Sequence, residues 1–181
     1  MIAIISGTNR PGSNTRKVAA QVESHYQALG VAVQVLDLAN LPAGLLSPES
    51  YALKPAGFTS FTDAILASDG LVIITPEYNG SFPGVLKYFI DLLPFPESFE
   101  RRPVCFIGLA AGVWGALRSV EQLQAIFGYR NAHSYPERVF LPGIGKLLDD
   151  AGRFTSPEAE KRLVAQASGF CKFVETLKTD K

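Results

Sequence analysis

The sequence predicts an α/β protein in which helices cover both faces of one parallel β-sheet. Short apolar runs rich in Val, Ile and Phe alternate along the chain with longer amphipathic stretches, which is the pattern of successive βα units. The 181 residues, 47% of them hydrophobic, suffice to bury one full core. No repeat, low-complexity tract or linker interrupts the pattern, so we expect a single domain over residues 1–181.

Five strands are expected. The first is the apolar run that Ser6 ends, at 2–6, and three similar runs follow at 32–37, 71–75 and 104–109. The fifth is expected between residues 131 and 141. Because apolar residues continue through these runs instead of alternating with polar ones, both faces of the sheet should be buried.

Five helices should fill the gaps. The first, at 15–29, ends at Gly30, a residue that commonly terminates helices. The others are expected at 61–67, 84–93, 116–127 and 157–177. Strict alternation of strand and helix implies parallel strands joined by right-handed crossovers.

Two windings of such a sheet are common, and the position of a ligand follows from either. Sites form beyond the carboxyl ends of the strands, where the winding reverses. In the five-stranded order 2-1-3-4-5, which we expect here, this point lies between strands 1 and 3. The loops after strands 1, 3 and 4 should therefore converge.

Charge and composition exclude several classes of partner. Lys plus Arg equals Asp plus Glu at 17 each, so no global field attracts nucleic acid or an anionic membrane, and the surface is not the strongly acidic one of a soluble electron carrier. The apolar start is too short for a signal peptide, and no run approaches a membrane span. Cys105 and Cys171 have no metal-ligand spacing. We expect a cytoplasmic protein with buried thiols and no metal.

The loop after the first strand is suited to bind a phosphate. Residues 7–15 read Gly-Thr-Asn-Arg-Pro-Gly-Ser-Asn-Thr and lead directly into the first helix, whose free amides and positive dipole end favour an anion. Side-chain hydrogen bonds are expected from Thr8, Ser13, Asn14 and Thr15, and a charge-assisted one from Arg10. The alternative is that Ser13 or Asn14 only caps the helix.

Two other phosphate motifs do not match this loop. Gly7 and Gly12 have the spacing of a Walker loop, but Ser13-Asn14 stands where Lys-Ser/Thr is required. The dinucleotide fingerprint G-x-G-x-x-G is also absent. A single phosphate monoester is the ligand that remains.

The loop after the third strand carries a specific motif. Residues 76–91 read Pro-Glu-Tyr-Asn-Gly-Ser-Phe-Pro-Gly-Val-Leu-Lys-Tyr-Phe-Ile-Asp. This segment closely resembles the hallmark segment of the NAD(P)H-dependent FMN reductases, which include quinone, azo-dye and chromate reductases. With residues 7–10 and the last helix, the resemblance covers essentially the whole chain. It implies a flavodoxin-like three-layer sandwich, bound FMN, NADPH or NADH as co-substrate, and a homodimer or homotetramer.

The resemblance also implies site residues. The phosphate would meet Thr8, Arg10, Ser13, Asn14 and Thr15, and the isoalloxazine ring or ribityl chain would meet Pro76, Glu77, Tyr78 and Asn79, with Ser81 beside them. Independently of the family, Pro76 and Pro83 stiffen this loop, Tyr78 offers an aromatic surface, and Gly80 permits the turn. Ser81 is placed to cap the next helix. Glu77 touches the flavin or pairs across a dimer; the sequence favours neither.

The loop after the fourth strand is glycine-rich, and such reductases usually have a glycine-rich turn here that reaches the pyrimidine side of the flavin. The expected contacts are Ala111, Gly112, Val113, Trp114 and Gly115. A helix beginning near Gly115 would direct its positive end at the flavin N1 and O2. Trp114 either shields the flavin and narrows substrate access or packs on the surface. Arg118 either reaches the nicotinamide cofactor or, as we expect, faces solvent.

These features predict a ping-pong oxidoreductase. Hydride passes from NAD(P)H to FMN and then to a small-molecule acceptor such as a quinone, azo dye, free flavin or metal ion. Hydride transfer needs no side-chain acid or base, so no catalytic side chain is assigned. The alternatives are an electron-transfer or FMN-binding protein without nicotinamide activity, and a fold relative that has lost flavin and acts as an interaction module.

Overall fold

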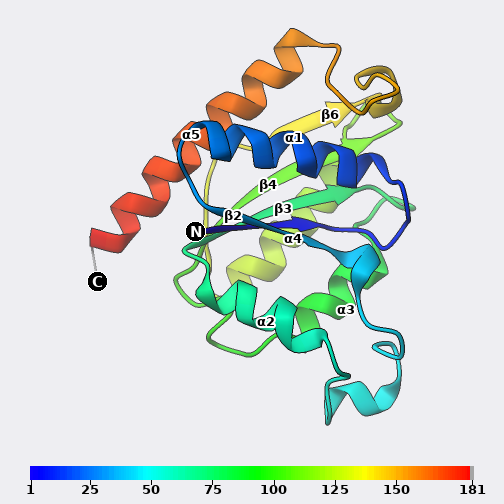
Figure 1. The fold of residues 1–181 in the computed structure, drawn as a ribbon, viewed down its shortest axis with the longest axis vertical. Helices are drawn as coiled ribbons and strands as arrows, with labels where there is room; N and C mark the ends of the chain where they lie inside the picture. Colours follow the sequence, from blue (N-terminus) through cyan, green and yellow to red (C-terminus); the bar gives the residue numbers. More distant parts are fainter. Residues whose placement is uncertain (180–181) are drawn as a thin grey trace.

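The computed structural model describes residues 1–179 and contains one parallel sheet between two layers of helices (Figure 1). The strands are β1 (Ile2–Ser6), β2 (Val33–Asp37), β3 (Gly70–Pro76), β4 (Pro103–Ala110), β5 (His133–Ser134) and β6 (Val139–Pro142). They lie in the order β2-β1-β3-β4-β5, with β6 also paired to β4, and all pairs are parallel. The expected order 2-1-3-4-5 is confirmed.

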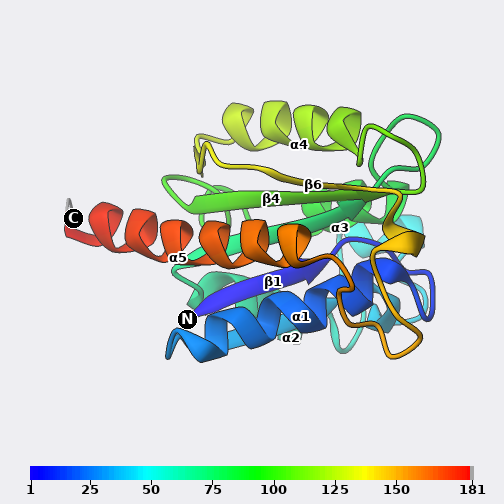
Figure 2. The same ribbon diagram turned by 90° about the horizontal axis from the view of Figure 1, so that it is seen from above.

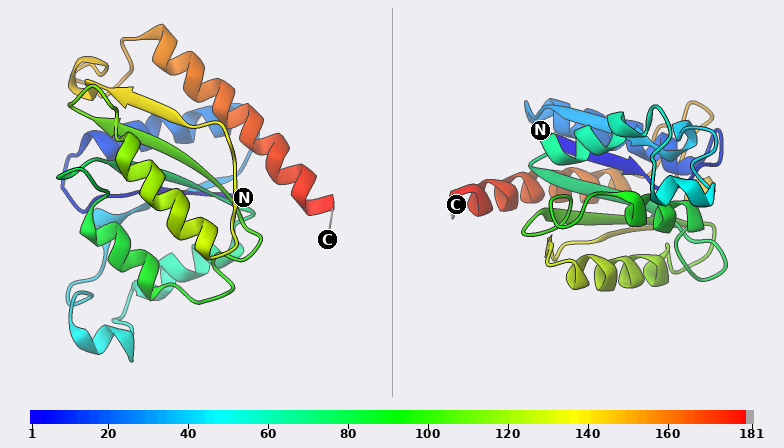
Figure 3. Two further views of the ribbon diagram at one scale, coloured as in Figure 1. Left: turned by 180° about the vertical axis from the view of Figure 1, so that it is seen from behind. Right: turned by 90° about the horizontal axis from the view of Figure 1, so that it is seen from below.

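The helices are α1 (Asn14–Ala28), α2 (Phe58–Ala67), α3 (Gly84–Leu92), α4 (Leu117–Tyr129) and α5 (Pro157–Thr179). One face of the sheet is covered by α1 and α5, which lie side by side, and the opposite face by α2, α3 and α4 (Figures 2 and 3). α2 begins three residues earlier than expected because Phe58 is fully buried and packs with Phe61. α4 begins one residue later than expected because Ala116 has a φ of 71° and is the N-cap.

The central strands of the sheet contribute to two cores. In β1, Ala3 and Ile5 pack with buried side chains of α2, α3 and α4, whereas Ile2 and Ile4 pack beneath α1 and α5. β3 and β4 repeat this alternation. Burial on both faces explains why the sequence shows nearly continuous apolar runs at these strands.

The fifth strand position is interrupted. β5 ends before Pro136, which has no backbone N–H to donate, and pairing with β4 resumes at Val139. The side chain of Gln166, buried on α5, lies at the gap. Its Nε2 donates hydrogen bonds to the carbonyl oxygens of Phe106, at 3.0 Å, and of Glu137, at 2.8 Å. One amide group therefore satisfies two backbone acceptors at the interruption.

Replacing Gln166 with methionine should lower the free energy of unfolding by about 1–2 kcal/mol, because two backbone acceptors lose their donor while the buried volume is kept. Urea unfolding followed by circular dichroism measures this. Gln27→Met on the exposed side of α1 is the matched control and should leave stability within about 0.5 kcal/mol of the parent. Equal stability of the two variants would contradict this role for Gln166.

Both cysteines are unpaired thiols. Cys105 is fully buried in β4, and burial raises the pKa of its thiol far above the usual range. Cys171 is only half-buried on α5, so the expectation of two buried thiols holds fully for Cys105 alone. Within residues 1–179, no helix is long and apolar enough to cross a membrane.

The strands that carry the candidate site end at one edge of the sheet. In the register of the sheet, Ser6 of β1 lies beside Ile74 of β3, and Pro76 of β3 lies beside Leu109 of β4. The segment between β2 and α2 contains the short helices η1 (Leu38–Asn40) and η2 (Pro48–Tyr51) and projects from the body at the β2 side of this edge (Figure 1, cyan).

Candidate functional site

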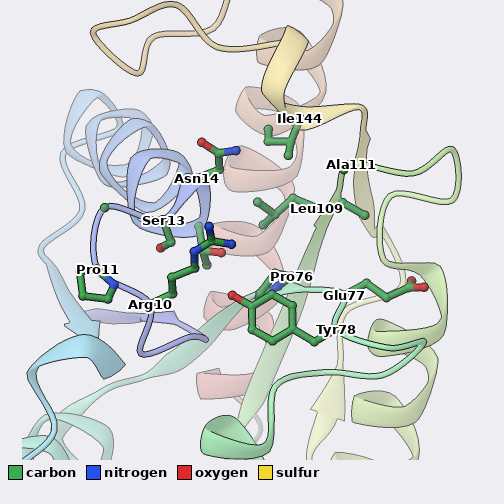
Figure 4. Close-up of a pocket in the computed structure, with 13 residues that line it drawn as sticks. Arg10, Pro11, Ser13, Asn14, Pro76, Glu77, Tyr78, Leu109, Ala111 and Ile144 are labelled. Atoms are coloured by element: carbon green, nitrogen blue, oxygen red, sulfur yellow. The ribbon is translucent and has the colours of Figure 1, made fainter.

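A pocket of about 430 Å³ lies at the carboxyl edge of the sheet, between the loops after β1 and β3 and against the end of β4 (Figure 4). Its volume is in the range of small-molecule and cofactor sites. The lining residues are Arg10, Pro11, Gly12, Ser13, Asn14, Thr15, Pro76, Glu77, Tyr78, Leu109, Ala110, Ala111 and Ile144. The expected convergence of loops at this edge is therefore present.

The loop after β1 forms one wall and delivers the amino end of α1 to the pocket. Ser13 is the N-cap residue of α1, and its Oγ accepts a hydrogen bond from the Arg16 amide at 3.2 Å. Ser13 thus caps the helix and also lines the pocket, so the two interpretations of this residue are compatible. Asn14 and Thr15 follow it along the wall. The first-turn amides and the helix dipole favour an anion here.

The electrostatics of this wall depend on Arg10. Its side chain is exposed and lines the pocket, and within residues 1–179 its guanidinium has no ion-pair or hydrogen-bond partner. Arg16, in the first turn of α1, is instead paired with Asp37 at 3.6 Å. Arg10 is therefore a cation without a counter-charge at a helix amino terminus, which fits a phosphate.

Thr8 lies beneath the pocket and does not line it. Its side chain is fully buried, and its Oγ1 accepts a hydrogen bond from the Arg10 amide at 3.3 Å. The same Oγ1 is 3.0 Å from the hydroxyl of Tyr78. Thr8 therefore connects the loop after β1 to the loop after β3.

The loop after β3 is a tight hairpin turn. The backbone N–H of Tyr78 donates to the Ser81 carbonyl at 2.8 Å, and the return bond measures 3.1 Å. Asn79 and Gly80 have φ values of 52° and 78°, as a type I′ turn requires. Tyr78 stands in the pocket with its hydroxyl directed toward the loop after β1 (Figure 4), whereas Asn79 lies at the tip of the turn and does not line the pocket.

Ser81 does not cap α3, so that expectation was wrong. Pro83 is the N-cap residue of α3, and it makes no side-chain cap hydrogen bond. Ser81 is held in the hairpin turn two residues earlier, and its hydroxyl donates to Oε1 of Gln122 on α4 at 2.6 Å. The geometry of the turn determines its partner and overrides the local capping preference.

Glu77 points away from Tyr78 and toward α4 (Figure 4). Its Oε1 is 3.3 Å from the Arg118 guanidinium, while its Oε2 is buried with no hydrogen-bond partner among the described residues. Arg118, expected to face solvent, is 55% exposed but has this carboxylate as its partner. An ion-pair partner for Glu77 is thus present within the chain itself.

Of the residues predicted in the loop after β4, only Ala111 lines the pocket. Gly112, Val113 and Trp114 are exposed, Trp114 at 59%, and Gly115 is buried. The loop folds back onto the sheet at Gly108 of β4, where an added Cβ would lie 2.6 Å from the Gly115 carbonyl oxygen. This close approach holds the start of α4 near the pocket edge.

Five lining residues were not predicted: Pro11, Gly12, Leu109, Ala110 and Ile144. Leu109 and Ala110 are the last residues of β4. Because the site was expected at the carboxyl ends of the strands, the end of the predicted fourth strand could have indicated both residues as lining residues. Ile144 begins the short helix η3 (Ile144–Lys146), which directly follows β6 and Gly143. The carboxyl end of the fifth strand position therefore supplies a fourth segment of the pocket, which the sequence pattern did not predict.

The fold and the pocket together define a class of protein. A doubly wound sheet in the order 2-1-3-4-5, with an anion-binding helix terminus and an aromatic wall where the winding reverses, is a flavodoxin-like arrangement for a mononucleotide. In residues 1–179, no group of His, Cys, Asp and Glu side chains is arranged to hold a metal ion.

Comparison with known proteins identifies the family. Residues 1–145 match the family described as NADPH-dependent FMN reductase. An NAD(P)H-dependent FMN reductase from Pseudomonas aeruginosa is 30% identical over 179 residues, covering 96% of this chain and 95% of that protein. A quinone reductase from Pseudomonas putida is 30% identical over 158 residues, covering 84% and 83%. The chain belongs to the NADPH-dependent FMN reductase family.

A solved structure supports the fold. The flavoenzyme NAD(P)H:(acceptor) oxidoreductase FerB from Paracoccus denitrificans superimposes with a TM-score of 0.81 at 24% identity, covering 97% of each chain. With the family established, the protein is an NAD(P)H-dependent flavin oxidoreductase with FMN as cofactor. The unpaired Arg10 and the volume of the pocket fit that cofactor.

Proposed function

We propose that this protein transfers hydride from NADPH or NADH, through FMN held in the pocket, to a small oxidised acceptor such as a quinone, an azo dye, free flavin or a metal ion. The observation that carries the proposal is the position of Arg10, an unpartnered cation beside the amino end of α1, opposite the aromatic side chain of Tyr78. The name of the Pseudomonas putida relative supports quinones as acceptors.

Each wall of the pocket has a proposed role. The backbone amides at the start of α1, with Arg10 and the polar side chains of Ser13, Asn14 and Thr15, bind the phosphate. The ring lies along Pro76, Glu77 and Tyr78 and reaches Ala111. Bound FMN supplies the hydride-transfer chemistry. The chain orients the flavin, and Thr8 fixes the hydroxyl of Tyr78.

The residues outside the lining have more distant roles in this proposal. Asn79, Gly112, Val113, Trp114 and Gly115 belong to the two turns that flank the pocket. Val113 and Trp114 are large, apolar and exposed, at 80% and 59%, so we place them where the nicotinamide or the acceptor approaches. Ser81 acts through Gln122 and not through the flavin.

Assembly and location are also proposed. Three apolar side chains, those of Leu46, Tyr51 and Leu53, are 60–79% exposed on the segment that projects between β2 and α2. Their exposure supports contact with a second copy in a homodimer or homotetramer. The unpaired thiols support a cytoplasmic location. The chain acts as one FMN-binding domain over residues 1–181.

Mixing the FMN-loaded protein with NADPH or NADH under nitrogen tests the function. We expect the visible flavin band to bleach with at least one nicotinamide and to return when a quinone is added. A protein that binds FMN but is reduced by neither nicotinamide would be an electron-transfer or flavin-carrying protein. A protein that takes up no FMN would contradict the site itself.

A further inference from the structure

The side chain of Gln122, on the exposed side of α4, contacts both of the last two residues of the hairpin turn. Its Nε2 donates to the Gly80 carbonyl oxygen at 3.3 Å, and its Oε1 accepts from the Ser81 hydroxyl at 2.6 Å. One helical turn earlier, Arg118 contacts Glu77 at the start of the same loop. Side chains at positions i and i+4 of α4 thus hold the two ends of the loop.

The hairpin turn needs such support. Among residues 1–179, two backbone hydrogen bonds close it, both between Tyr78 and Ser81, and a two-stranded hairpin by itself is marginally stable in water. Tyr78 extends from the turn toward the loop after β1, where its hydroxyl meets Thr8, while Gly80 and Ser81 meet α4. The direction of the Tyr78 ring therefore depends on contacts on both sides of the turn.

We propose that Gln122 is a positioning residue for the flavin ring: by holding Gly80 and Ser81 it fixes the turn that presents Tyr78 to the pocket. This inference rests on the proposed function, since it assigns the ring to the Tyr78 wall. Gln122 does not line the pocket, so its effect on the ring is exerted through the turn.

The contacts of Gln122 with the turn are exposed at the surface. Losing them lets water replace the lost partners, so the free energy of unfolding should change little. The order of the turn, and with it the affinity for the ring, should change more. A local effect on flavin without a global effect on stability is therefore the expected signature.

The test is Gln122→Met, which keeps the length of the side chain and removes both polar atoms. We expect affinity to fall about fivefold for FMN and by the same factor for riboflavin, because the two ligands share the ring. The visible circular dichroism of the bound flavin should change, and the midpoint of thermal unfolding measured without flavin should not. Gln27→Met is the matched control, and Arg10→Ala should weaken FMN alone.

Ser81→Ala removes the hydrogen bond between Ser81 and Gln122 by changing the residue in the turn. It provides a second measurement if Gln122→Met fails to fold. The double variant should lose less than the product of the two single losses, because the same contact is removed twice. Unchanged flavin affinity and dichroism in both single variants would overturn the inference. Equal weakening by Gln27→Met would also overturn it. If the parent protein binds neither flavin, the proposed function fails first.

Discussion

Replacing Arg10 with alanine should weaken FMN binding by about 1.5–3 kcal/mol, which is about 12- to 150-fold in the dissociation constant. The guanidinium has no protein partner within residues 1–179 and lies beside the amino end of α1. The Arg10 guanidinium is therefore available for a charge-assisted hydrogen bond to the phosphate. Riboflavin, which lacks the phosphate, should bind the variant and the parent equally. Fluorescence titration of both flavins at constant ionic strength measures the difference.

Arg16→Ala is the matched control for Arg10. It removes the same charge two residues into α1, but Arg16 is paired with Asp37 and does not line the pocket. We expect the FMN affinity of this variant to stay within about threefold of the parent value. The charge of Arg16 lies outside the pocket, and salt screens its effect on the ligand. Equal losses in both variants would show a general effect of charge. Unchanged affinity in Arg10→Ala would remove Arg10 from the site.

The second large effect is expected at Gly7, where the loop after β1 passes close to β3. An added Cβ would lie 2.7 Å from the Ile74 carbonyl oxygen and 3.0 Å from Cδ2 of Leu86. The Gly7 amide also donates to the Ile74 oxygen at 2.8 Å, so a fixed backbone group stands in the way. Gly7→Ala should lower the free energy of unfolding by about 2–3 kcal/mol and should abolish tight FMN binding, because the phosphate loop must move.

Gly128→Ala controls for the loss of glycine flexibility. Gly128 is the second-last residue of α4, and an added Cβ there meets nothing within 4 Å. This variant should be at least as stable as the parent, with a gain of up to about 0.5 kcal/mol, because the full helix-propensity difference applies only in a helix interior. Urea unfolding and FMN titration of both variants separate the effect of losing a glycine from the effect of the steric clash at Gly7. A Gly7→Ala protein as stable as the parent, with parental FMN affinity, would contradict the close approach.

The arrangement of the sheet followed from the sequence because its signals are repeated and local. β1, β3 and β4 are buried on both faces, so their residues are largely apolar, and each helix between strands has room to cross back over the sheet. The break at Pro136 was not predicted, although a proline within a strand is a signal for one. The compensation by Gln166 could not be predicted, since Gln166 is thirty residues away along the chain and reaches the gap only through packing of α5.

The site was predictable to different extents in its three loops. The loop after β1 has its glycines, hydroxyls and helix start within nine residues, and four of its five predicted contacts line the pocket. In the loop after β3, Asn79-Gly80 is a strong signal for a type I′ turn. A prediction that gave this turn precedence over helix capping would have placed Ser81 in the turn and not at the start of α3. The turn after β4 depends on the contact of Gly108 with Gly115, which no local pattern reveals.

The central claim is that FMN lies across the carboxyl edge of the sheet, between the loop after β1 and the hairpin turn after β3. A crystal structure of the protein with FMN tests it most directly. The phosphate should accept hydrogen bonds from the amides at the start of α1 and from Arg10, and the ring should lie along Pro76 and Tyr78. Flavin bound at another surface, or bound here with its phosphate at the hairpin turn and its ring beside Arg10, would contradict the account.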